Sequence, residues 1–200
     1  SVVLPLEQRL AALPLPDSLK YPARRHTPAL QADLAALGLD WSPHPLPETL
    51  ATSLPAAYGT LYVLEGSTLG GQLISRHLKK HLNLDGTSGA AYFSGYGPDT
   101  GRQWRAFTQF MRDAEREATQ PGWADAMVQD MVQEARAAFA VFAAAHAVGA
   151  LTASLPVLLV TRVLAAVANA AIVPTVNVLC VLIFARYGTA ERARPGLILR

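Results

Sequence analysis

The segment LYVLEGSTLGGQ at residues 61–72 has the apolar spacing of a helix and carries three glycines inside it. An interior glycine costs a helix about 0.5–1 kcal/mol relative to alanine, so three of them need a compensating role. Gly66 and Gly70 lie four residues apart. Ser67 and Gly71 have the same spacing, so one face of the helix presents two rows of very small side chains. Such a face predicts either close packing against another helix, the commoner event, or a planar ligand lying across the backbone.

The sequence has one cysteine and five histidines as candidate metal ligands. The single cysteine excludes an intramolecular disulfide and a cysteine-rich metal site, and it favours a reducing compartment, which we expect to be the cytoplasm. His77 and His81 have an i, i+4 spacing that suits a metal, but they adjoin a basic cluster typical of a solvated helix end. We expect solvated or capping roles for all histidines, with His26 and His44 in exposed proline-rich segments, and His146 at the end of a helix. No metal ligand is assigned.

The elements that position the glycines are predicted to be helices, because apolar residues recur at helical spacing. The predicted helices cover residues 2–13, 27–37 (ending at Gly38), 47–81 (with a break near Pro55), 100–118 and 124–147, and residues 83–101 form an irregular connection. The expected fold is therefore an all-α helical bundle over residues 1–147. The net charge of +2 in 200 residues does not indicate a nucleic-acid partner.

Residues 148–200 differ in composition and are predicted to be an apolar C-terminal extension with a basic tail. Residues 163–185 carry no charge and reach the length of a membrane span. The sequence is therefore compatible with two interpretations, membrane contact through residues 148–185 or a buried helical hairpin. Residues 150–170 resemble a helix of a major-facilitator transporter. One or two spans cannot form a transport path, so the resemblance favours a fusion over a transporter.

The order of residues in the glycine motif carries a second resemblance. YVLEGSTLGGQ at residues 62–72 resembles the distal-helix motif of the heme oxygenases, most closely the bacterial group associated with bacteriophytochromes. Residues 82–99, with the aromatic pair Tyr92 and Phe93, resemble the variable loop of that family, and residues 134–139 resemble its last conserved helix. The resemblance covers about residues 2–146.

The resemblance implies a heme oxygenase, which uses heme as cofactor and substrate with O2 and electrons from a ferredoxin or reductase, and yields biliverdin, CO and ferrous iron. It implies that Gly66, Gly70 and Gly71 crowd bound O2 with backbone alone, and that the Ser67 hydroxyl joins a distal hydrogen-bond network. Its implied heme-binding residues are Arg105 (for a propionate), Phe139 and Gln72. An exposed surface Arg and an ordinary core Phe are the alternatives for the first two.

The sequence departs from the family at three points. Ser67 stands where animal-type enzymes have an aspartate, and a hydroxyl cannot supply the charge of a carboxylate. Gln109 stands where a second propionate-binding arginine is expected. The family ligates iron through a histidine on its first helix, a segment expected before Ser1. A heme-binding or scaffold domain without turnover and a membrane-associated fusion protein are therefore the alternative functions.

Overall fold

The computed structural model describes residues 2–39, 46–117 and 123–152, and these form a helical molecule. The α-helices are α1 (Val3–Ala11), α2 (Thr27–Ala36), α3 (Leu54–Leu82), α4 (Ala91–Ser94), α5 (Thr100–Glu117) and α6 (Trp123–Thr152). Short 3-10 helices occur at Asp17–Leu19 (η1), Tyr21–Arg24 (η2) and Gly97–Asp99 (η3). The predicted all-α fold class is confirmed.

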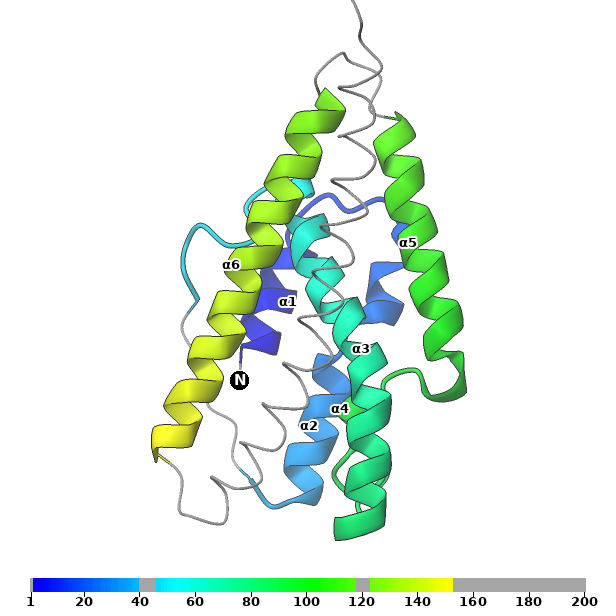
Figure 1. Ribbon diagram of the computed structural model, residues 1–200, viewed down its shortest axis with the longest axis vertical. Helices are drawn as coiled ribbons and strands as arrows, with labels where there is room; N and C mark the ends of the chain where they lie inside the picture. Colours follow the sequence, from blue (N-terminus) through cyan, green and yellow to red (C-terminus); the bar gives the residue numbers. More distant parts are fainter. Residues whose placement is uncertain (1, 40–45, 118–122, 153–200) are drawn as a thin grey trace, which may run out of the picture.

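Helix α3 runs through the middle of the molecule, with α5 and α6 on either side of it (Figure 1). The prediction that this helix starts near Pro47 and breaks at Pro55 is wrong: it begins at Leu54. Ser53 caps it by accepting the N–H of Ala56 at 3.2 Å, and Pro55 lies in the first turn, where its missing N–H costs nothing.

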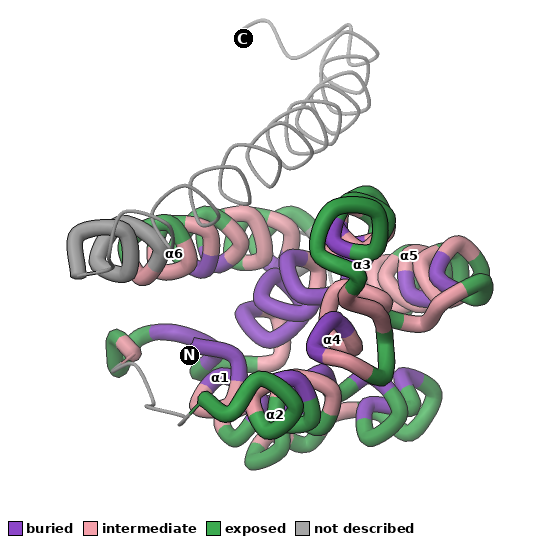
Figure 2. The backbone as a smooth tube through the Cα atoms, turned by 90° about the horizontal axis from the view of Figure 1, so that it is seen from below, coloured by how far each residue is buried: buried purple, intermediate pink, exposed green. Residues whose placement is uncertain are grey.

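The core forms where α3 meets its neighbours, and Figure 2 marks the buried parts of the backbone in purple. Phe107 on α5 and Met127 on α6 are buried in one cluster with Leu61 and Leu64 of α3, as expected for helices whose apolar residues recur at helical spacing. A Cβ atom at Gly59 would collide with the carbonyl oxygen of Met131. Glycine at this position therefore allows the backbones of α3 and α6 to approach closely.

The connection between α3 and α5 is more ordered than the sequence predicts. Residues 83–101 contain α4 and η3 instead of an irregular loop throughout. The end of α2 agrees with prediction, because Gly38 adopts the left-handed conformation with φ of 65°.

Helix α6 continues through the expected boundary at residue 147 to Thr152. In the described ranges, no helix is both long enough and apolar enough to span a membrane. The apolar run 163–185, and all but the first three residues of the transporter-like segment 150–170, lie outside the described residues.

Candidate functional site

The glycine motif lies where the central helix changes from buried to partly open. On α3, residues 56–65 are buried except for the half-buried Tyr62, whereas Gly66, Ser67 and Gly70 are each only half-buried. A Cβ atom at Gly66 would meet the ring of Trp104 at 3.7 Å, an ordinary van der Waals distance, and no nearer atom among the described residues. Packing within the described part of the chain therefore does not require glycine at position 66.

Gly71 has a different role. A Cβ atom there would lie 2.7 Å from the carbonyl oxygen of Phe93 on α4, closer than a real side chain tolerates. The absence of a side chain at Gly71 thus lets the backbone of α4 rest directly on α3. Close packing therefore explains the glycine at position 71. At position 66 the other explanation, a ligand lying across the backbone, is the one left.

The Ser67 side chain faces α4. Its hydroxyl donates to the carbonyl oxygen of Leu64 at 2.7 Å, one turn earlier on α3. Burial raises the pKa of the Tyr92 phenol on α4, and the nearby Ser67 side chain opposes that rise. Because the Ser67 proton is committed to a carbonyl, the hydroxyl oxygen offers lone pairs, which suits it to accept hydrogen bonds.

Gln72 links three helices. Its side-chain amide nitrogen donates to the carbonyl oxygen of Ser94 at 2.8 Å and to the hydroxyl of Thr100 at 3.1 Å. The amide therefore ties α3 to the end of α4 and the start of α5. A heme-binding role for Gln72 rests on the resemblance alone.

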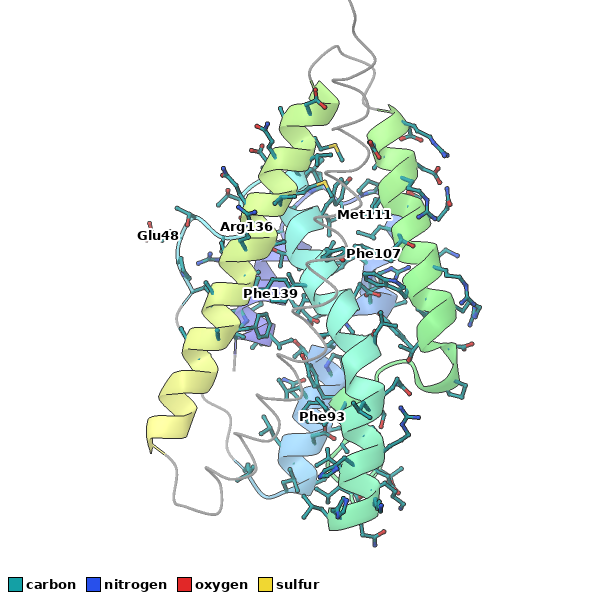
Figure 3. The ribbon with its side chains drawn as sticks, in the orientation of Figure 1. Glu48, Phe93, Phe107, Met111, Arg136 and Phe139 are labelled. Atoms are coloured by element: carbon teal, nitrogen blue, oxygen red, sulfur yellow. The ribbon has the colours of Figure 1, made fainter. Side chains whose placement is uncertain are left out.

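The other candidate heme-binding residues lie on the flanking helices. Arg105 follows Trp104 on α5 and is exposed, and among the described residues its guanidinium has no ion-pair partner. Phe139 projects inward from α6 (Figure 3) and packs, partly buried, on a cluster containing Leu6 and Val63. Gln109 is exposed and hydrogen-bonded within α5, as its amide donates to Asp113 at 2.8 Å.

Sequence reasoning missed a buried polar cluster next to the motif. The Glu65 carboxylate accepts from the Arg24 guanidinium at 2.9 Å and from the Tyr96 hydroxyl at 2.7 Å. Burial raises the pKa of Glu65, while Tyr96 and Arg24 oppose that rise by stabilising the charged form. The sequence contains a feature that could have predicted this cluster: Glu65 lies among apolar residues next to Gly66, and a buried glutamate needs a cationic partner elsewhere in the chain.

The prediction that His26 is exposed is wrong. His26 is only 7% exposed, and burial lowers its pKa, with the charge of Arg24 adding to the effect. Its Nε2 atom lies 3.9 Å from a Glu65 oxygen and has no hydrogen-bond partner within the described structure. The backbone N–H of His26 instead donates to the buried Glu7 carboxylate at 2.5 Å.

His77 and His81 lie near the C-terminal end of α3, and they are the other histidines whose side chains the structure describes. His77 and His81 are exposed, with ring centroids 4.3 Å apart, and the neighbouring lysines and arginine are solvated as predicted. His44 and the side chain of His146 lie outside the described residues. In the part of the chain described, no three His, Cys, Asp or Glu side chains gather as a metal site.

Comparison with known proteins identifies the class. The family described as heme oxygenase matches residues 27–147, which is more than half of the chain. A protein of Xanthomonas campestris pv. campestris (strain 8004), described as "Heme oxygenase", is 38% identical over 84 residues. That alignment covers 42% of this chain and 48% of the relative, so the chain spans about half the length of the curated relative it matches.

No solved structure matches this chain. The family match covers α2 through most of α6 and includes the glycine motif and the α4 segment packed against it. The chain therefore belongs to the heme oxygenase family, as the motif resemblance predicted.

Proposed function

We propose that this chain is a heme oxygenase that cleaves heme to biliverdin, CO and ferrous iron with O2 and an external electron donor. The family acts on heme. The observation that carries the proposal is Gly66 itself, which is half-exposed on the central helix and whose missing side chain is not required by packing within the described residues. A glycine that packing does not explain, in a helix that it destabilises, is consistent with close approach of a ligand.

The residues present fit heme on this side of α3. Gly66 and Gly70 would give the porphyrin access to the helix backbone, and the Arg105 guanidinium, which has no ion-pair partner among the described residues, suits a propionate. Heme supplies the oxidation chemistry when bound, while the protein supplies position, hydrogen bonds and exclusion of water.

Ser67 would orient the hydrogen bonds at the site. Because its proton is engaged by the Leu64 carbonyl, the Ser67 oxygen acts as an acceptor that fixes the orientation of a donor facing α3. It does not contribute a charge, and so it would hold a neutral donor such as water without changing the net charge of the site.

The buried ion pair between Arg24 and Glu65 would fix the rotation of α3. Glu65 immediately precedes Gly66, and its carboxylate is held by Arg24 of η2 and by Tyr96 in the turn after α4. Turning α3 about its axis would leave this carboxylate buried without partners, which is costly. The glycine face therefore keeps a constant orientation towards the ligand.

The partners follow from the same resemblance. We propose a ferredoxin or reductase as electron donor and delivery of biliverdin to a bacteriophytochrome, in the cytoplasm. The heme-oxygenase-like unit is proposed to be residues 1–147, with residues 148–200 as a separate apolar extension.

The test is a titration of the full chain with ferric heme, followed by ferredoxin, ferredoxin reductase and NADPH under air. We expect a saturable Soret band that decays as a biliverdin band grows at longer wavelength. Gly66→Leu should abolish this decay, because the side chain would cover the backbone beside Trp104. Arg76→Leu, which adds the same side chain at an exposed position of α3, should leave it unchanged.

Two results would contradict the proposal. A Soret band that stays constant under reducing conditions would favour a heme-binding module without turnover. Equal decay in Gly66→Leu and the wild type would remove the role given to Gly66.

A further inference from the structure

Helix α4 is too short to hold its own shape. It comprises only Ala91–Ser94, and a single helical turn is unstable in water without outside contacts. It nevertheless carries Tyr92, which interacts with Ser67, and Phe93, whose carbonyl rests on Gly71. Whatever fixes α4 therefore also fixes what lies next to the glycine motif.

The N-terminal end of α4 is held by a buried carboxylate from another helix. Asp33 of α2 is only 6% exposed, and its two carboxylate oxygens accept the backbone N–H groups of Ala91 at 2.6 Å and Tyr92 at 2.8 Å. These are charge-assisted hydrogen bonds to the first N–H groups of a helix, roughly twice as strong as neutral ones.

The C-terminal end of α4 is held from α3. The Gln72 amide donates to the carbonyl oxygen of Ser94, and the Ser75 hydroxyl lies 3.2 Å from that of Ser94. Figure 2 shows α4 enclosed between α2 and α3. Since both ends are pinned, α4 cannot slide along α3 without breaking one of these attachments.

The Tyr92 ring is restrained by its surroundings as well. It makes edge contacts with the buried ring of His26, at a centroid distance of 6.2 Å, and with Phe93, at 5.5 Å. The Tyr92 ring therefore lies between two aromatic neighbours, on a segment whose backbone is anchored by Asp33.

We propose that Asp33 is a positioning residue of the heme site, which holds α4 against Gly71 of the glycine motif. The inference rests on the proposed function. Asp33 anchors the N-terminal end of α4, and the carbonyl oxygen of Phe93 on α4 lies directly against Gly71. Releasing this end would therefore displace α4 from the glycine motif and change the surroundings of Ser67 and Gly71.

The first test does not involve heme. Amide hydrogen exchange, measured by NMR on the full chain, should be at least about tenfold faster at Ala91 and Tyr92 in Asp33→Asn than in the wild type, since a neutral amide has one acceptor oxygen in place of two. Unchanged exchange at both amides would overturn the anchoring role of Asp33.

Glu134→Gln is the matched control. Glu134 is a buried carboxylate on α6 that accepts the backbone N–H of Ala51 at 2.5 Å and the hydroxyl of Thr60 at 3.1 Å, away from α4. This variant should accelerate exchange at Ala51 and leave Ala91 and Tyr92 protected. Acceleration at all three amides in both variants would show general loosening and would overturn a specific role for Asp33.

The second test connects Asp33 to the site. In the heme-loaded full chain, Asp33→Asn should change the pH profile of heme turnover, because it displaces α4 beside the glycine motif, whereas Glu134→Gln should leave the profile unchanged. An Asp33→Asn profile identical to that of the wild type would refute the positioning role. If the wild type binds no heme, the proposed function fails, whereas the exchange result still decides whether Asp33 anchors α4.

Discussion

Replacing Gly66 and Gly71 separately by alanine should change stability in opposite directions, although the two residues belong to one motif on one helix. At Gly66 the new methyl group would lie 3.7 Å from the Trp104 ring, so it fits without rearrangement. The helix then gains the usual advantage of alanine over glycine, about 0.5–1 kcal/mol.

At Gly71 the same methyl group would lie 2.7 Å from the Phe93 carbonyl oxygen, a backbone atom pinned by the attachments of α4. Overpacking of this kind typically costs about 1–3 kcal/mol, which exceeds the gain in helix propensity. Gly71→Ala should therefore be destabilising by up to about 2.5 kcal/mol, the largest difference between these two effects.

The assay is urea unfolding of the full chain followed by circular dichroism at pH 7.5. The midpoint should rise for Gly66→Ala and fall for Gly71→Ala, with similar slopes for both. Gly59→Ala extends the series, because its methyl group would collide with the Met131 carbonyl and should be more destabilising than Gly71→Ala. A loss of stability in Gly66→Ala as large as that in Gly71→Ala would refute the division of the motif into a packing glycine and an open one.

Three further outcomes are expected. Arg24→Met should lower the free energy of unfolding in urea by about 3–5 kcal/mol, because it leaves the buried Glu65 carboxylate without its cation. Adding Glu65→Gln should recover part of this loss, and no recovery in the double variant would contradict the role of the ion pair. The folded-state pKa of His26 is lowered below 6.5, so the unfolded state binds more protons as the pH falls below about 6.5, and the wild type should lose stability between pH 7.5 and 5.5. His26→Gln should lose less over the same range, and an equal loss would assign the pH dependence to other groups. Lys79→Ala should raise the depressed pKa of Asp85 in an NMR titration, because the hydrogen bond from Lys79 is the largest cause of that depression. The unfolding midpoint should not change, because both side chains are exposed. An unchanged Asp85 pKa would contradict this expectation.

The spacing of apolar residues along the sequence predicted the longer helices well, because these residues recur at the period of a helix. The boundaries of α2 and α5 agree closely with expectation, and Phe107 and Met127 are core residues as their spacing indicates. Helix α4 was missed because its four residues form a helix only when a carboxylate from α2 satisfies their N–H groups. That contact joins residues far apart in sequence, so local propensity carries no signal of it.

The candidate site was also predicted only in part from the sequence. The motif at residues 61–72 was visible as an unusual density of glycine, but the sequence alone treated its glycines as equivalent. Their separation into Gly71, required by packing, and Gly66, not required by it, depends on the position of α4 and α5 in space. The burial of His26 was likewise hidden, because proline-rich flanks indicate a surface segment unless a buried partner such as Glu7 is known.

The most direct test of the central claim is product analysis by mass spectrometry and CO detection. The full chain is incubated with ferric heme, ferredoxin, ferredoxin reductase and NADPH under air, with Gly66→Leu in parallel. The proposed function predicts biliverdin and CO in equal amounts from the wild type and neither from Gly66→Leu. Intact heme recovered from the wild type, without biliverdin or CO, would contradict it.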